Sequence, residues 1–456
     1  MNARRPRRGR SLRAAVAIAC LSALSADAEC VDVRPVACER CFAVFVMPDI
    51  QSYVRRRYQP QGAAHLDLVM RYVCAHRERW QEPRTGKTMP ILMLIQLGDL
   101  VHGGAAQQEE GARLAEWVRV DAAFDRLDEC DPPVPYLVTL GNHDLDGGQY
   151  QDTSEGYDRY FGVARWADRG VQCADPARCD WPAGEYFIGG GDPILAHSRN
   201  HLGPGPTGPM RTLPGRHRAG VVGLPGGGRM LFLGLELAFD FPPAAPGREG
   251  LEGDDARWPL SVLAAHRDLP TLVFHHSMLW TFGPGDGRVR FGPEVWGSDS
   301  LVAGPEMGGT GSGMRALFER LVEPHPQVFM LVSGHVLQPA VQADFAIERA
   351  AGPPVQAFLR NYQSAGLQDA EQPSSRAPQN YGVGWNVIAA FDPDAGEVRV
   401  RSYRIDDVAS RSEPAPERRH RGEPAATECL DMDQGGVGER AFKWPFGKAD
   451  DSGAVP

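Results

Sequence analysis

Residues 42–51 read Phe-Ala-Val-Phe-Val-Met-Pro-Asp-Ile-Gln: six apolar residues that end at a proline and a carboxylate. An uninterrupted apolar run of this length, bounded by a proline, predicts a strand that is buried on both faces. Asp49 and Gln51 follow directly and are therefore expected at the carboxyl end of that strand. Because ligands of α/β proteins bind at this end of the sheet, both side chains are candidates for a functional site.

Four further motifs repeat this arrangement, each after an apolar run that predicts a strand. The strands are expected at 91–97, 134–140, 271–274 and 328–332, and they are followed by Gly98-Asp99, Gly141-Asn142-His143-Asp144, His275-His276 and Gly334-His335-Val336-Leu337. Apolar residues at helical spacing over 62–80 and 105–129 separate the first three strands, and shorter helices are expected at 254–266 and 314–323. This alternation predicts an α/β domain whose five motifs meet at one edge.

The C-terminal half predicts strands without intervening helices, at 340–348, 355–361, 383–391 and 397–405. Residues 163–228 are rich in Gly and Pro and are expected to form an insertion or lid over the sheet with some short strands, and with His197, His201 and His217 in solvent. Residues 409–456, rich in Pro and charge, predict a loose tail. We therefore expect one domain over 40–408.

The first 28 residues have the composition of a secretory signal. Six arginines precede an apolar run from Ala14 to about Ala26, and the run ends at the small-residue sequence Ala26-Asp27-Ala28. The run is too short for a permanent membrane span. The mature chain is thus expected to be exported, periplasmic or secreted, and without a membrane span. Arg7-Arg8 leaves open whether export follows the general or the twin-arginine route.

The charge of the mature chain argues against nucleic-acid binding. Without the six arginines and one aspartate of residues 1–28, 42 basic and 57 acidic residues remain, a formal charge of −15. A protein that binds nucleic acid through bulk charge carries the opposite sign. An anionic substrate would instead need local positive charge, which bound metal ions supply.

Eight cysteines remain after residue 28, and an even number in an exported chain predicts disulfides. Cys173 and Cys179 flank a short polar loop and are the best single candidate pair. Cys38-x-x-Cys41 has the spacing of a zinc or redox site, but no second pair or nearby histidine completes one, so a structural disulfide is favoured.

The residue types in the five motifs are those of a divalent metal centre. Carboxylate and amide oxygens and imidazole nitrogens bind Mn, Fe, Zn, Mg or Ca, and a centre with two ions needs one shared carboxylate. Asp99 is the natural shared carboxylate, because Gly98 permits a tight turn at the strand end. The sequence therefore predicts divalent metal ions, two of them, at this edge.

The order Asp-x-Gln, Gly-Asp, Gly-Asn-His-Asp, His and Gly-His-x-x resembles the calcineurin-like metallophosphoesterase superfamily, over residues 42–405. The resemblance implies an αββα sandwich of two mixed sheets flanked by helices. It implies Asp49 and Gln51 as ligands of one metal, Asp99 as the bridge, and Asn142, His275 and His335 as ligands of the other. His276 is the rival of His275, and His102 and Ser277 are expected in the wall of the site.

The same resemblance implies catalytic roles for the third motif. His143 would steady the phosphate or protonate the leaving group, and Asp144 would orient His143 through a hydrogen bond. Two positions depart from the usual pattern of the superfamily: Gln51 stands where most members have histidine, and Leu337 stands where most have a second histidine. Both departures affect the same metal, so that site is expected to be the weaker one.

The resulting expectation is an exported phosphoesterase that hydrolyses phosphate mono- or diesters through a metal-activated water. Its substrate would be a small phosphate ester or a nucleotide. The alternative, motivated by Leu337, is a binding protein on the same scaffold with little or no catalytic activity.

Overall fold

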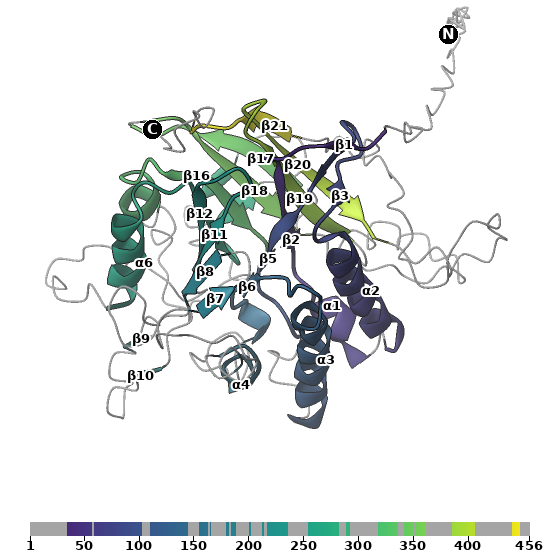
Figure 1. Ribbon diagram of the computed structural model, residues 1–456. Helices are drawn as coiled ribbons and strands as arrows, with labels where there is room; N and C mark the ends of the chain where they lie inside the picture. The colour runs from purple at the N-terminus through teal and green to yellow at the C-terminus, as the bar shows by residue number, and fades with distance from the viewer. Residues whose placement is uncertain are drawn as a thin grey trace, which may run out of the picture.

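The computed structural model describes two β-sheets that pack face to face, with helices on both outer sides (Figure 1). The general α/β class expected from the sequence is confirmed. The described residues are 34–56, 59–102, 110–144, 155–162, 165, 179–181, 184–187, 200–201, 212–213, 217–235, 254–281, 289–291, 318–335, 342–350, 352–361, 385–405 and 440–446.

The first sheet has six strands in the order β21-β20-β19-β2-β5-β6. Their bounds are β2 (Phe42–Met47), β5 (Ile91–Gln96), β6 (Tyr136–Val138), β19 (Trp385–Asp392), β20 (Glu397–Arg404) and β21 (Arg440–Lys443). The strands β2, β5 and β6 are parallel, whereas β19, β20 and β21 pair antiparallel. The three motifs that follow β2, β5 and β6 therefore leave the sheet at the same edge.

The second sheet has eight strands in the order β17-β18-β16-β13-β12-β11-β8-β7. Their bounds are β7 (Cys179–Trp181), β8 (Gly184–Phe187), β11 (Arg218–Gly223), β12 (Arg229–Leu235), β13 (Thr271–His275), β16 (Val328–Ser333), β17 (Gln342–Ile347) and β18 (Val355–Arg360). The central strands β12, β13, β16 and β18 are parallel, so the two histidine motifs leave this sheet at one edge as well.

Alternating side chains in the second sheet explain why two sheets stack. On β12 and β13, Phe232 and Phe274 belong to the apolar core shared with the six-stranded sheet, whereas Leu233 and Val273 face a second core. That second core includes Val262 of α6 (Asp254–Ala265). Each strand thus buries both faces, as its uninterrupted apolar sequence predicts.

Two helices cover the outer face of the six-stranded sheet, α2 (Gln61–His76) and α3 (Glu110–Asp128) (Figure 1). Val69 and Phe124 are among the residues that they contribute to the shared core. The smaller elements are β1 (Val36–Ala37), α1 (Gln51–Val54), β3 (Trp80–Gln81), β4 (Lys87–Met89), η2 (Asn142–Asp144), α4 (Glu155–Phe161), β9 (Asn200–His201), β10 (Thr212–Leu213), β14 (Leu279–Thr281), β15 (Val289–Phe291) and the π-helical turn η5 (Phe318–Val322).

Part of the predicted loose tail belongs to the domain. Strand β21 pairs with β20, and the amide of Trp444 donates to Gly396 O at 2.8 Å. The indole of Trp444 packs edge-on against Phe329 and Phe391, with ring centroids 5.1 and 5.7 Å apart. The domain therefore extends beyond residue 408. Burial of aromatic side chains stabilises this segment, although its composition, rich in Pro and charge, disfavours ordered structure.

The predicted insertion over 163–228 contains short strands, as expected, but their place in the fold differs from a lid. Its last part, β11, pairs with β12 along six residues, and β8 and β7 extend the same sheet. This part of the segment therefore continues the eight-stranded sheet instead of covering it. His217, expected in solvent, has no exposed surface. The rest of the segment lies outside the described residues.

Two disulfides are described, Cys38–Cys41 and Cys74–Cys130, with Cα atoms 5.3 and 5.7 Å apart. The Cys38-x-x-Cys41 pair is thus a disulfide, as favoured from the sequence. The predicted Cys173–Cys179 pair and the signal segment 1–28 lie outside the described residues. Among the described helices, none combines the length and apolar character needed to cross a bilayer.

The two disulfides should differ in their effect on stability, because they close loops of very different length. Cys74 and Cys130 are 56 residues apart, and Cys38 and Cys41 only 3. Loop entropy predicts a loss of about 4 kcal/mol for Cys74→Ala/Cys130→Ala and about 2 kcal/mol for Cys38→Ala/Cys41→Ala. Urea unfolding of both double variants measures the free energy of unfolding. A larger loss of this free energy in Cys38→Ala/Cys41→Ala than in Cys74→Ala/Cys130→Ala would contradict the ranking.

Candidate metal centre

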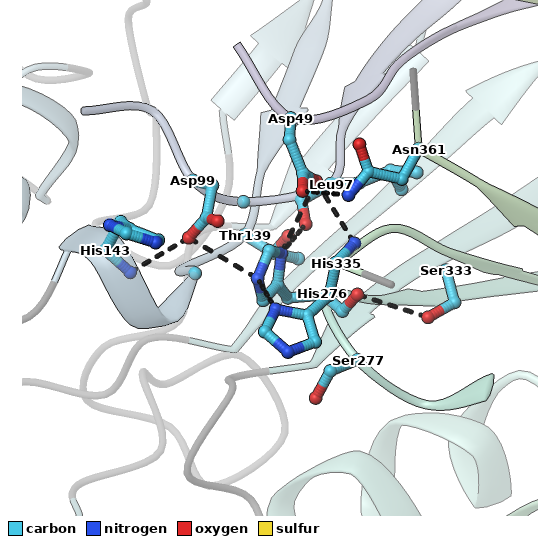
Figure 2. Close-up of polar contacts among 12 residues, drawn as sticks. Asp49, Leu97, Asp99, Thr139, His143, His276, Ser277, Ser333, His335 and Asn361 are labelled. Carbon is cyan, nitrogen blue, oxygen red and sulfur yellow. Dashed lines mark hydrogen bonds and ion pairs between the residues drawn. The ribbon is translucent and has the colours of Figure 1, made fainter. Parts of the chain in front are cut away.

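Polar side chains from both sheets meet where the parallel strands end (Figure 2). Asp49 follows β2, Asp99 follows β5 and His143 lies in η2 after β6. From the other sheet, His276 follows β13 and His335 follows β16. The convergence of the five motifs at one edge, expected from the sequence, is therefore present in the fold.

Three of these residues present ligand atoms close enough to share one ion. Asp99, His276 and His335 each offer one such atom, and all three atoms lie within 4.8 Å of one another. His276 Nε2 is 2.9 Å from His335 Nδ1 and 3.4 Å from Asp99 Oδ1. Ligands bound to one metal at about 2.0–2.2 Å lie about 2.8–3.6 Å apart, so the described separations fit a shared divalent ion.

The hydrogen bonds of His276 prepare its ring for metal binding. His276 Nδ1 lies 2.7 Å from Leu97 O, a carbonyl oxygen that can only accept, so Nδ1 carries the proton. Nε2 is then left with a lone pair that accepts a hydrogen bond from His335 Nδ1 at 2.9 Å, and a bound ion would take the place of that proton, which would move to the other ring nitrogen of His335. Backbone carbonyls commonly orient metal-binding histidines in this way.

The close group contains His276 and not His275, the residue preferred from the sequence. The ring of His275 turns elsewhere and its Nδ1 accepts the amide of Ser277 at 3.0 Å. We therefore replace His275 by His276 in the candidate ligand set.

Asp49 lies beside this group and is held by the second sheet. Its Oδ2 accepts a hydrogen bond of 2.8 Å from Asn361 Nδ2, and its Oδ1 accepts the His335 amide at 3.3 Å. Asn361 is fully buried directly after β18. Asn361 belongs to none of the five sequence motifs, although its place at the end of the predicted strand 355–361 is the signal that marks the other site residues.

The electrostatics of the site favour a bound cation. Burial, and then repulsion from Asp99, raise the pKa of both Asp49 and Asp144 well above the ordinary value. Loss of hydration lowers the pKa of His276 and of His335 to about 3, so both rings are neutral at pH 7. Neutral imidazoles can bind a metal without losing a proton, and a divalent ion would offset the repulsion among the carboxylates.

The backbone is strained at two of the three close residues. Asp99 and His335 have φ angles of 53° and 69°, and in the described part of the chain they alone among non-glycine residues have positive φ. Such conformations cost of order 1–3 kcal/mol each and are concentrated at functional sites. The neighbouring glycines are required for space: a Cβ on Gly334 would lie 2.5 Å from Asp49 Oδ1, and one on Gly141 would overlap Asp99 N.

Gln51, expected as a ligand, makes hydrogen bonds to two other site residues. Its Nε2 donates to Asp99 Oδ2 at 2.9 Å, and its Oε1 lies 2.7 Å from His102 Nδ1. His102, expected only in the wall of the site, stacks on His143 with ring centroids 5.1 Å apart. Gln51 and His102 thus belong to the site through hydrogen bonds.

His143 lies next to Asp99, but Asp144 does not orient it as expected. The amide of His143 donates to Asp99 Oδ1 at 2.9 Å, while its buried Nδ1 has no hydrogen-bond partner among the described residues. The Asp144 carboxylate accepts the amides of Gly141 and Val101 at 2.8 and 3.0 Å. Backbone donors reach Asp144 first because it sits inside the tight turn of η2, so it holds the loop in place.

Two predicted positions cannot be placed in the site. The backbone of Asn142 lies in η2, but its side chain is outside the described residues, as is Leu337.

Compared with known proteins, the chain matches no protein-family model and has no significant match among curated proteins.

Substitution of the two adjacent histidines should separate a ligand from its neighbour. In His276→Ala, Co²⁺ affinity is expected to fall more than about 100-fold, because loss of an outer-shell partner alone costs 10- to 100-fold. In His275→Ala the loss should stay below about 10-fold. Titration followed by the visible absorption of Co²⁺ measures both, and equal losses in two folded variants would contradict the assignment of His276.

Asp49→Asn should stabilise the protein in the presence of a chelator. Because the pKa of Asp49 is raised above 3.8, its ionised form costs folding free energy above the folded pKa. An amide removes this cost, of order 1 kcal/mol at pH 7, and Asn361 can turn its own amide to keep the contact. The gain should vanish as the pH falls toward 3.8, where the carboxylate of the unfolded chain is protonated.

Asp144→Asn serves as the comparison and should change the free energy of unfolding in the opposite direction, toward lower stability. Its amide nitrogen would face one of the backbone N–H groups from which the carboxylate now accepts hydrogen bonds. A loss of about 1–3 kcal/mol is expected. Thermal unfolding of both variants at pH 7 and pH 4.5 measures the difference, and destabilisation by Asp49→Asn at pH 7 would contradict the electrostatic argument.

Proposed function

We propose that this protein is an exported, metal-dependent phosphoesterase that hydrolyses phosphate mono- or diesters. The observation that carries the proposal is the close group of Asp99 Oδ1, His276 Nε2 and His335 Nδ1. The order of the five motifs, which resembles that of calcineurin-like metallophosphoesterases, supports the reaction class. The basic and apolar N-terminal segment, together with two disulfides, supports export.

A divalent ion held by Asp99, His276 and His335 would polarise a phosphoryl oxygen and lower the pKa of a water molecule. The chain's own contribution is to hold these three ligands in a buried, strained arrangement before the ion binds. Asp49 lies beside them, and a bound cation would stabilise its ionised form, which burial and Asp99 disfavour. The substrate phosphate would then be attracted by the ion, because the chain as a whole is acidic.

His143 is the candidate for proton transfer to the leaving group. Its backbone is tied to Asp99 and its ring stacks on His102, so the ring is held at the edge of the metal group. Its Nδ1 has no hydrogen-bond partner among the described residues. General acid catalysis of this kind contributes about 10²–10⁴-fold to a rate.

The proposal predicts hydrolysis of bis(p-nitrophenyl) phosphate that depends on added Mn²⁺ and stops with a chelator. Asp99→Ala and His143→Ala should each lower kcat/KM by about 100-fold or more. Asp67→Ala is the matched control, since Asp67 pairs with Arg71 and Arg126 on the surface of α2 and α3, where ion pairs contribute little. Its kcat/KM should equal that of the wild type.

The alternative is a binding protein on the same scaffold, which Leu337 favours because a leucine cannot bind metal. The same measurements distinguish the two functions. Tight Mn²⁺ binding without turnover of phosphate mono- or diesters would exclude the enzyme and support the binding protein. Turnover that survives in Asp99→Ala would show that the metal group is not the active site.

A further inference from the structure

Gln51 and His102 form a chain of hydrogen bonds that ends on Asp99. Gln51 Nε2 lies 2.9 Å from Asp99 Oδ2, and Gln51 Oε1 lies 2.7 Å from His102 Nδ1. Gln51 is almost completely buried, with 1% of its surface exposed, and Asp99 has 2% exposed. Buried polar groups of this kind need their partners, so removing one of them affects the next.

The chemistry of the three groups sets the direction of each hydrogen bond. An ionised carboxylate only accepts, so the atom of Gln51 that faces Asp99 is its amide nitrogen. The amide oxygen then faces His102, whose Nδ1 must carry the proton. The order of donation is therefore His102 to Gln51 and Gln51 to Asp99.

The other end of this chain is held by the fold. The amide of His102 donates to Glu116 Oε2 of α3 at 2.8 Å, and the ring of His102 stacks on His143 at an interplanar angle of 17°. His102 is thus attached to α3 and to η2. His102 in turn fixes the position of Gln51, and Gln51 fixes the position of the Asp99 carboxylate.

We propose that Gln51 and His102 are positioning residues for Asp99 and that Gln51 takes the place of a second metal ion. The inference rests on the proposed metal-dependent function. The Gln51 amide N–H binds Oδ2 of Asp99, whereas His276 lies near Oδ1. A neutral donor there satisfies Asp99 Oδ2 without a cation. The centre therefore binds one divalent ion per chain.

Asp49 supports a centre with one ion. A second ion, as implied by the resemblance to two-metal enzymes, would need Asp49 and Gln51 as ligands. The two oxygens of Asp49 accept hydrogen bonds from Asn361 and from the His335 amide, and the oxygen of Gln51 accepts one from His102. Protein donors thus engage the oxygens that would bind a second ion.

The test is the stoichiometry and affinity of Mn²⁺ binding by the full chain, measured by calorimetry and by metal analysis after dialysis. The wild type should bind one ion. His102→Leu removes the donor to Gln51 and should weaken binding about 10- to 100-fold. His102→Asn places an amide nitrogen near the position of Nδ1 and should restore binding to within about 3-fold of wild type, an effect that general loss of packing would not produce.

Two further variants complete the experiment. Gln51→Glu puts a second carboxylate against Asp99 Oδ2 and should raise the stoichiometry from one ion to two. His266→Leu is the matched control and should bind Mn²⁺ like the wild type, because His266 directly follows α6, whose Val262 packs into the second core.

The outcomes separate this inference from the proposed function, because none of these measurements depends on turnover. Two ions in the wild type, unchanged binding in His102→Leu, or His102→Asn as weak as His102→Leu would each overturn the positioning role. The expected binding pattern without hydrolysis of any phosphate ester would leave the inference standing and overturn only the proposed function.

Discussion

The buried carboxylate of Asp99 is the group on which the rest of the site depends. It leaves β5 in a left-handed conformation, and its two oxygens contact Gln51 of α1, the amide of His143 in η2 and the ring of His276 from the other sheet. A carboxylate without water must be matched by donors or cations on every side. Four segments therefore meet at Asp99: the end of β5, α1, η2 and the loop after β13. Their contacts determine how the edges of the two sheets lie against each other.

This constraint also explains where the chain tolerates strain. Asp99 and His335 are the non-glycine residues with positive φ in the described part of the chain, and a Cβ on Gly334 would lie 2.5 Å from Asp49 Oδ1. The large shared core, with Phe232 and Phe274 on one sheet and Phe45 on the other, supplies the stability that such strain costs. Local strain and strong packing thus occur together, a combination typical of functional sites.

Several strands of the fold were predictable from the sequence, because an uninterrupted apolar run indicates a strand that is buried on both faces. The predicted strand 42–47 coincides with β2, and 91–97 and 328–332 lie within one residue of β5 and β16. The prediction failed where composition misleads: Trp444 joins the core from a segment rich in Pro and charge, and β11 extends a sheet from a Gly-rich segment. These contacts are long-range, and local sequence carries no signal of a partner strand.

The sequence by itself determined which residue types follow the strands, and hence that a group of carboxylates and imidazoles lies at one edge. Only the tertiary structure decided between His275 and His276, because adjacent residues point to opposite sides at a strand end and one carbonyl, Leu97 O, selects the ring. The tertiary structure also places the Asp144 carboxylate against backbone amides and brings Gln51 within hydrogen-bonding distance of His102. Hydrogen-bond partners depend on distances between segments far apart in the chain, and a motif does not contain them.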